Sequence, residues 1–141
     1  MKVTIHLPQG SRVLLLEDNL ERVDWFRSKV PELYWVADIT TAFAAMKQFT
    51  FDFFFLDRDL GIEHYSGAVE GSGEDFAAHL RELGYTGQSV VIHSWNPAGA
   101  LRMKSMLPQA TVLPFGEFDI RFYVELTDGE KTKKVSQGES G

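Results

Sequence analysis

Hydrophobic positions follow two different spacings that alternate along the chain. Over residues 3–7 apolar side chains alternate with polar ones, which indicates a half-buried strand, whereas the continuous apolar run in "RVLLLED" is typical of a strand covered on both faces. Residues 20–30 have apolar positions at helical spacing until Pro31 ends the pattern, and residues 42–49 repeat that spacing. The N-terminal part of the chain therefore predicts strands and helices in alternation.

The same alternation continues through the middle of the chain. "FDFFFLD" and "SVVIHSWN" are short apolar runs that predict buried strands, and "YWVADIT" and "ATVLPF" are weaker strand signals. Ser72 and Asp75 fit a capping box in front of a helix over residues 76–83, and Pro97 stands at the first position of a helix that continues to Leu107. Helices alternating with continuously apolar strands predict an α/β three-layer domain with a mainly parallel central sheet.

The C-terminal part changes period. Residues 118–126 alternate between apolar and polar side chains, which is strand spacing. We expect this segment to pair with the strand at residues 3–7 as an antiparallel extension at the sheet edge. One domain over residues 1–128 and a flexible tail over 129–141, which has no apolar anchor, complete the predicted organisation.

Composition narrows the possible functions. The net charge of −6 argues against an extended nucleic-acid surface, which needs clustered Lys and Arg, but permits a phosphorylated small molecule or an RNA end as partner. The chain has no cysteine, so oxygen atoms or histidine would hold any metal. The sequence has no apolar run long enough to cross a membrane and no secretory leader, which makes a cytoplasmic location the expectation. The oligomeric state is not predicted.

Four carboxylates stand at the ends of two predicted strands: Glu17, Asp18, Asp57 and Asp59. In a parallel sheet these ends share one edge, where uncompensated carboxylates would repel one another. A divalent cation would neutralise them, and oxygen ligands suit Mg²⁺, Mn²⁺ or Ca²⁺. The alternative is that these acids are solvated or paired with Arg12, Arg22 or Arg58.

His93, Ser94 and Asn96 follow the next buried strand. Histidine can transfer protons near neutral pH, and a hydroxyl or amide can hydrogen-bond phosphate oxygens. Structural roles are open as well, because His93 could be a core residue and Asn96 before Pro97 is a good helix N-cap.

The polar, glycine-rich segment after residue 61 is a third candidate region. It contributes Glu63 and His64, and His64 could reach the acidic edge. Ser72, Gly73 and Asp75 also belong to it, but the capping box already accounts for the serine and the aspartate.

Together these residues resemble the receiver domain of response regulators. The shared segments are "VLLLEDN", "FFFLD" and "VVIHS", and the resemblance implies that the acidic pair and Asp57 bind Mg²⁺ and that Asp57 accepts a phosphoryl group. Two features differ. Leu113 occupies the place of a lysine that precedes Pro-Phe in receivers, and a strand pattern replaces the last helix.

A divergent group, the cyclic-phosphate-processing receiver domains, is more similar. Its pattern matches "EDNLER", "LDRDLG", "SGED" and "HSWNPAGALRM", over roughly residues 11 to 115, although Arg58 replaces the usual histidine. This resemblance implies a receiver-like, flavodoxin-like fold and a phosphoesterase that acts on a cyclic nucleotide or a 2′,3′-cyclic phosphate RNA end.

The resulting hypothesis is a metal-dependent phosphoesterase. The four carboxylates would bind Mg²⁺ or Mn²⁺, with Asp57 or a water as nucleophile and His93 as general acid or base. Ser94 and Asn96 would hold phosphate oxygens, and Arg22 or Arg58 would supply the charge of the missing lysine. The alternatives are a noncatalytic receiver-like module that binds a phosphorylated ligand or a protein partner and, third, an atypical phosphoacceptor receiver.

Overall fold

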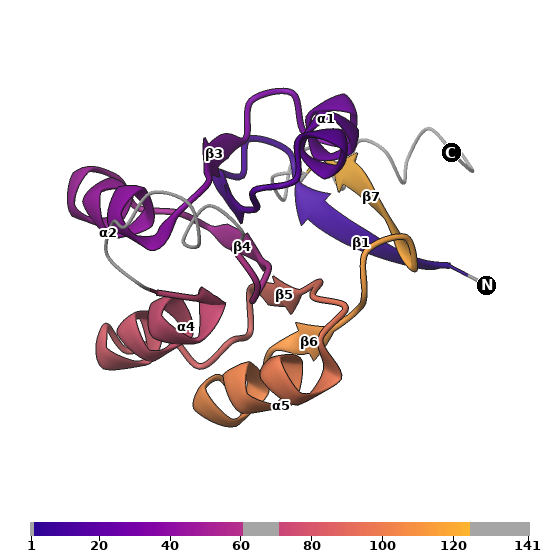
Figure 1. Cartoon of the computed structure of the whole chain (residues 1–141). Coiled ribbons are helices and arrows are strands. Elements are labelled where there is room, and N and C mark those ends of the chain that lie inside the picture. Colours follow the sequence, from indigo (N-terminus) through magenta and orange to yellow (C-terminus); the bar gives the residue numbers. More distant parts are fainter. Residues whose placement is uncertain (1, 61–70, 125–141) are drawn as a thin grey trace, which may run out of the picture.

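The structure, a computed structural model, describes residues 2–60 and 71–124 (Figure 1). In chain order its elements are β1 (Val3–Pro8), β2 (Val13–Leu16), α1 (Leu20–Lys29), β3 (Tyr34–Val36), α2 (Ile39–Gln48), β4 (Phe53–Leu56), α4 (Gly73–Glu82), β5 (Val90–Ile92), α5 (Pro97–Met106), β6 (Thr111–Val112) and β7 (Phe118–Tyr123). The predicted tail at 129–141 and the candidates Glu63 and His64 lie outside the described residues. None of the helices in the described part is long and apolar enough to cross a membrane.

Five strands form the central sheet, in the order β3-β2-β4-β5-β6, and all neighbouring pairs are parallel. The strands match the short apolar runs of the sequence, so the predicted α/β fold with a parallel sheet is confirmed. From β2 the chain moves outward to β3 and then returns to β4 on the other side of β2. The winding thus reverses between β2 and β4, where open α/β sheets bind ligands beyond the carboxyl ends of their strands.

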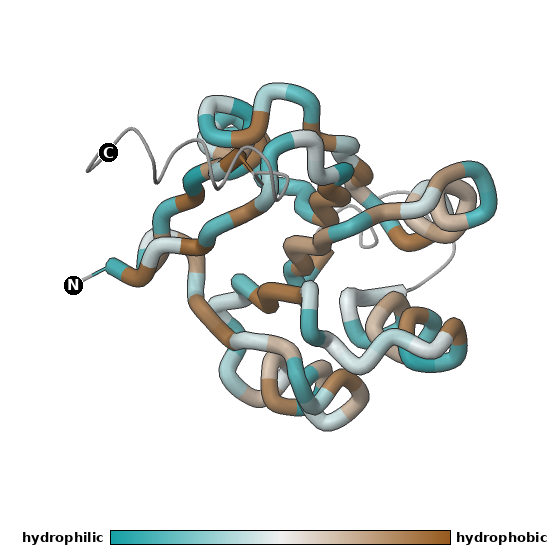
Figure 2. Tube along the Cα trace, turned by 180° about the vertical axis from the view of Figure 1, so that it is seen from behind, coloured by the Kyte–Doolittle hydropathy of each residue, from teal (hydrophilic) through white to brown (hydrophobic). Residues whose placement is uncertain are grey.

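Alternate residues of each central strand serve two separate cores. Leu14 and Phe54 face the layer of α2, α4 and α5, whereas Leu15 and Phe55 face α1 and the β1–β7 pair. Figure 1 shows these layers on either side of the sheet, and Figure 2 shows brown hydrophobic segments in the interior strands. Burial on both faces explains why these strands are continuously apolar rather than alternating.

The two terminal strands correct one prediction. They form a separate two-stranded sheet and pair parallel, with Val3 opposite Phe118 and Pro8 opposite Tyr123. The expected antiparallel extension of the main sheet was therefore wrong. Alternation indicates which face of a strand is buried but not the direction of its partner. Since no tight turn joins β1 to β7, nothing local imposes a hairpin.

The β1–β7 pair covers part of one sheet face. Phe118 stacks on Phe55 at 5.9 Å between ring centroids, and Leu7 and Ile120 join the same core. Together with α1, the pair buries that face, so the alternating C-terminal pattern belongs to a strand that packs across the sheet rather than along its edge (Figure 1).

Candidate functional site

Glu17, Asp57 and His93 converge at the carboxyl edge of the sheet. Each residue directly follows a strand (β2, β4 and β5), and neighbouring backbones are joined by hydrogen bonds from Asp57 N to Leu16 O and from His93 N to Leu56 O, both 3.0 Å. All three side chains are buried. One potential ligand atom from each lies within 4.8 Å of the others, so this cluster could hold a metal ion.

The Glu17 carboxylate is held on both of its oxygen atoms. Oε1 lies 2.8 Å from Nε2 of His93 and 3.7 Å from the guanidinium of Arg22, and Oε2 accepts hydrogen bonds from the backbone N–H groups of Asp18 and Asn19. Burial acts to raise the pKa of Glu17, but the hydrogen bond and charge of His93, the Asn19 N–H and Arg22 together lower it. Glu17 is therefore a buried carboxylate stabilised in its charged form.

Asp57 has the opposite electrostatic balance. Its Oδ1 accepts one hydrogen bond, from the Arg58 N–H at 2.9 Å. Burial and the negative charge of Glu17 raise the pKa of Asp57 to about 6, against the lowering effects of His93, the Arg58 N–H and Arg22. A bound cation would relieve this cost, since it would compensate the buried negative charge.

His93 is completely buried and contacts the ring of Phe26 at 5.1 Å between centroids. Its Nε2 is bonded to Glu17, whereas its Nδ1 is buried with no hydrogen-bond partner among the described residues. The sequence suggested His93 as a proton-transfer residue but gave no sign of its pairing with Glu17, because the two are 76 positions apart.

The other two predicted metal ligands lie outside this cluster. Asp18 is half-buried beside Glu17. The exposed Asp59 pairs with the guanidinium of Arg58 at 2.7 Å and lies 3.5 Å from the side-chain amide of Asn96. The structure thus separates the four carboxylates into a buried pair and an outer pair.

Arg58 stands where the cyclic-phosphate-processing receiver domains that the sequence resembles usually carry a histidine. Its side chain is directed toward α4 and α5. Its Nε contacts Glu74 at 2.6 Å, and Arg102 binds the same carboxylate at 2.7 Å. A Cβ added to Gly99 would lie 2.8 Å from the Arg58 side chain, so the missing side chain at residue 99 makes room for this arginine. Both acidic partners raise the pKa of the Arg58 guanidinium, Asp59 most strongly.

Arg22 and the β5–α5 loop complete the edge of the site. The guanidinium of Arg22 lies over the ring of Phe115, 5.1 Å from its centroid, next to Glu17. Ser94 is buried, and its Oγ accepts a hydrogen bond from Asn96 N at 3.1 Å. Asn96 caps α5 through the N–H of Gly99, as the sequence indicated, and the Ser72–Asp75 capping box of α4 is also present.

Two further residues support the site: Gly73, which the sequence placed in the third candidate region without a role of its own, and Trp35, which was not predicted. A Cβ on Gly73 would lie 2.0 Å from the backbone oxygen of Asp57, so α4 begins in direct contact with the Asp57 backbone. The indole N–H of Trp35 donates to the carbonyl of Glu17 at 2.7 Å. Each interaction joins segments far apart in the sequence, which local spacing does not reveal.

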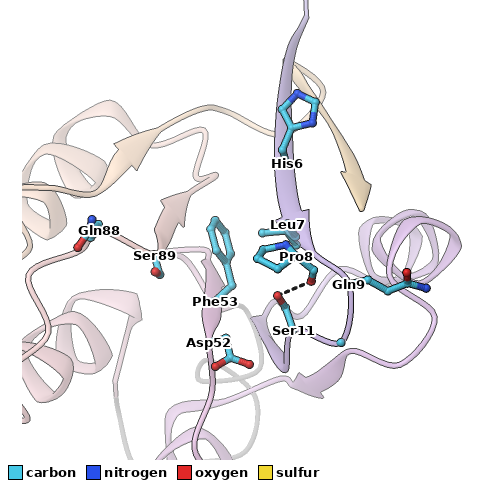
Figure 3. A pocket seen from close by; sticks show the side chains of 10 residues that line it. His6, Leu7, Pro8, Gln9, Ser11, Asp52, Phe53, Gln88 and Ser89 are labelled. Carbon is cyan, nitrogen blue, oxygen red and sulfur yellow. Dashed lines mark hydrogen bonds between the residues drawn. The ribbon is translucent and has the colours of Figure 1, made fainter. Parts of the chain in front are cut away.

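A separate pocket lies at the opposite end of the sheet (Figure 3). Its volume is about 540 Å³, and it is lined by residues 6–11 at the end of β1 and by residues 52–53 and 88–89 at the amino ends of β4 and β5. In Figure 3 the Asp52 carboxylate and the Ser11 hydroxyl lie at this pocket, and none of the three residues of the acidic cluster lines it. It therefore does not belong to the site at the carboxyl edge.

A family model described as a cyclic-phosphate processing receiver domain matches residues 12–109, more than half of the chain. The chain belongs to this family. The match contains all three residues of the buried cluster, and it confirms the resemblance seen in the sequence motifs. No curated protein matches the sequence significantly.

Solved structures support the fold. A CheY-like response regulator receiver domain from Methylobacillus flagellatus is similar with a TM-score of 0.53 and 19% identity, over 92% of this chain and 98% of that one. A response regulator receiver domain from Rhodospirillum rubrum is similar with a TM-score of 0.50 and 14% identity, over 89% of both chains. At such identities the likeness concerns the fold, not the reaction.

Proposed function

We propose that the protein is a metal-dependent phosphoesterase that acts on a cyclic phosphate, either a cyclic nucleotide or a 2′,3′-cyclic phosphate RNA end. The observation that carries the proposal is the buried cluster of Glu17, Asp57 and His93 at the sheet edge, in a chain whose family is described as processing cyclic phosphates. Ligand sites of open α/β sheets occur at this edge, near the reversal between β2 and β4.

The donor chemistry of the cluster suits a divalent cation. Asp57 and Glu17 are carboxylates with further lone pairs, and oxygen ligands favour Mg²⁺ or Mn²⁺. The raised pKa of Asp57 points the same way, since this carboxylate has too little compensating positive charge in its surroundings. When bound, such a cation would act as a Lewis acid on the phosphate oxygens and lower the pKa of a coordinated water. Asp18 and Asp59 would extend the acidic edge as outer ligands.

Asp57 is the proposed nucleophile or water-positioning group. It ends the central strand β4, whose backbone is fixed on both sides by β2 and β5. Rigid placement of a reacting carboxylate lowers the entropic cost of reaching the transition state. Because Asp57 must be charged for this role and the cation competes with its proton, we expect activity at subsaturating metal to rise with pH through the metal-free pKa of about 6.

Two roles are proposed for His93. Its bond to Glu17 keeps that carboxylate oriented and charged, which is a positioning role that the present geometry supports directly. The second role, proton transfer to or from the reacting oxygen, needs the ring to become accessible to substrate, because the side chain is fully buried.

Cationic and polar groups would bind the phosphate from outside the cluster. Arg22 is the better placed of the two candidate arginines, since it lies beside Glu17 while Arg58 is shared between Asp59 and Glu74. Ser94 and Asn96 precede the N-terminus of α5, where backbone N–H groups favour anions. These groups would stabilise charge on the non-bridging oxygens.

Incubation with 2′,3′-cyclic AMP and Mg²⁺ or Mn²⁺ tests the proposal. We expect phosphomonoester product from the purified chain, loss of product on chelation with EDTA, and at least a hundredfold loss, about 3 kcal/mol of transition-state stabilisation, for Asp57→Asn. Asp24→Asn, an exposed substitution in α1, is the matched control. Product formation at the same rate by wild type and Asp57→Asn would refute the proposed site.

One observation favours a noncatalytic alternative. Leu113 stands where receivers carry a lysine, and it is partly buried against the core between the sheet and α1. Without the lysine, the site could bind a phosphorylated ligand or a protein partner without turnover. The missing lysine also disfavours phosphoryl transfer to Asp57 as in a signalling receiver. Calorimetric binding of 2′,3′-cyclic AMP with no product would support the binding module, and a stable adduct on Asp57 after treatment with acetyl phosphate would support the phosphoacceptor.

A further inference from the structure

Trp95 is exposed at the edge of the candidate site, which is unusual for tryptophan. Its exposed fraction is 59%, and among the described residues its indole has no hydrogen bond or ring contact. The other two tryptophans are packed: Trp25 lies against Phe26 and Phe115, and Trp35 is hydrogen-bonded to Glu17. Trp95 is therefore the tryptophan that offers its ring to solvent.

The backbone on both sides of Trp95 is fixed. The Oγ of Ser94 accepts the N–H of Asn96 at 3.1 Å, and Asn96 in turn caps α5 by accepting the N–H of Gly99 at 3.0 Å. Pro97 has a fixed φ and also restricts the backbone of the preceding residue, Asn96. A ring presented by such a loop loses little backbone entropy when it binds a ligand.

The sheet order places this loop beside Asp57. β4 lies between β2 and β5, so the loop at residues 17–19 and the loop at residues 93–96 stand on either side of the end of β4. Leu20, the first residue of α1 directly after the first of these loops, is also exposed, at 64%. A phosphate at Asp57 would thus lie between two segments that each carry an exposed large hydrophobic side chain.

Resting on the proposed function, we propose that Trp95 is a specificity-determining residue that stacks on the nucleobase of the substrate. The substrate class is then a nucleoside 2′,3′-cyclic phosphate, free or as the last nucleotide of an RNA, rather than a cyclic phosphate without a base. An aromatic ring stacks on any base because every base has a π-face, so we expect little preference among the four bases. The acidic net charge fits recognition of one terminal nucleotide instead of a long strand.

Two substrates separate the contribution of the base from that of the phosphate. The full chain and its variants are assayed with 2′,3′-cyclic AMP and with glycerol 1,2-cyclic phosphate, which has the same five-membered phosphate ring and no base. We expect Trp95→Ala to lower kcat/KM for the nucleotide about 5- to 100-fold and to leave kcat/KM for the glycerol ester within about twofold of wild type. Trp95→Phe should retain most of the activity on the nucleotide. Equal effects of Trp95→Ala on both substrates, or no effect on either, would overturn the stacking role.

A control variant and a binding measurement keep the two proposals apart. Leu83→Ala is the control, because Leu83 is 53% exposed and lies at the end of α4 that is far from Asp57. This substitution should leave kcat/KM unchanged for both substrates. If wild type hydrolyses neither compound, the phosphoesterase proposal fails, and titration of tryptophan emission with 2′,3′-cyclic AMP then decides the stacking role. Quenching in wild type that is lost in Trp95→Phe supports stacking without turnover, whereas unchanged emission overturns it.

Discussion

Nε2 of His93 lies 2.8 Å from Oε1 of Glu17, and neither side chain is exposed to solvent. This contact joins the end of β5 to the end of β2 across the end of β4. Because both partners are buried, removing Glu17 leaves the His93 ring without a hydrogen bond among the described residues, and removing His93 leaves Oε1 of Glu17 without one, while Oε2 keeps the N–H groups of Asp18 and Asn19. The pair is consequently a structural requirement for the candidate site as well as part of it.

His93→Ala should destabilise the fold by about 3–5 kcal/mol, since it leaves the buried Glu17 carboxylate without its main partner. His93→Gln should cost less, because its amide can still donate to Glu17. Urea unfolding at pH 7.5 measures both. The double variant Glu17→Gln with His93→Ala should lose less than the sum of the single changes, and strict additivity would contradict the coupling.

Asp57→Asn should stabilise the metal-free protein. Burial raises the pKa of Asp57 from 3.8 to about 6, so the folded state binds a proton more tightly than the unfolded chain and loses stability as pH rises from about 4 to 6. Above pH 7 this cost is about 3 kcal/mol, and the uncharged asparagine avoids it. Urea unfolding in EDTA should therefore show that Asp57→Asn has a much larger free energy of unfolding than wild type at pH 7.5, whereas at pH 4 the difference should be less than about 1 kcal/mol.

Glu17 provides an internal contrast for that experiment. Burial acts to raise the pKa of Glu17, but His93, the Asn19 N–H and Arg22 together lower it. The charged Glu17 carboxylate therefore stabilises the fold when the pH is above the ordinary pKa of 4.5, and this stabilisation is lost as the pH falls below that value. The stability of wild type should thus pass through a maximum on the acidic side of pH 6. A stability that rises steadily up to pH 7 in EDTA would contradict the assignment of Asp57.

The strand ends were visible in the sequence because the apolar runs stop abruptly at Glu17, Asp57 and His93. Parallel strands present their carboxyl ends at one edge, so the fold class alone predicted that these residues meet. The sequence did not distinguish Glu17 from Asp18, because neighbouring residues leave a strand end in different directions and only the packed structure shows that Glu17 turns inward.

Other features depend on contacts that local pattern does not encode. Arg58 reaches Glu74, which is 16 positions away and on another element, so its role between two aspartates could not be inferred from spacing. The direction of β7 relative to β1 was likewise open, because strands that no short turn connects can pair in either sense. Periodicity identified each element, whereas tertiary packing determined its partners.

Mn²⁺ or Mg²⁺ should raise the melting temperature of wild type but not of Asp57→Asn. The cation competes with the proton on Asp57, so its apparent affinity should weaken up to about tenfold for each pH unit below about 6. Thermal unfolding at increasing metal concentration, repeated between pH 5 and 7.5, measures both effects. Asp24→Asn should respond as wild type does, and an equal response of Asp57→Asn would place the metal elsewhere.

Arg22→Gln should reduce hydrolysis of 2′,3′-cyclic AMP more than Arg58→Gln does. Arg22 lies 3.7 Å from Glu17 and over Phe115, so its charge acts at the buried cluster, and its loss should cost about tenfold or more in kcat/KM. Arg58 is already paired with Asp59 and Glu74, and its removal should mainly loosen the contact between α4 and α5. If Arg58→Gln lowered kcat/KM more than Arg22→Gln at unchanged stability, Arg58 would be the substrate-binding cation.

Gly73→Ala tests whether the start of α4 fixes the position of Asp57. The added Cβ would lie 2.0 Å from the backbone oxygen of Asp57 and 2.8 Å from the Cα of Arg58, and backbone atoms cannot give way as a flexible side chain can. Either α4 or the end of β4 must move, so we expect a loss of about 1–3 kcal/mol in the free energy of unfolding and a weaker metal-induced rise in melting temperature. Glu82→Ala, in the last turn of the same helix, is the control and should change neither quantity appreciably. Wild-type stability together with wild-type metal response in Gly73→Ala would show that the contact between Gly73 and Asp57 does not determine the geometry of the site.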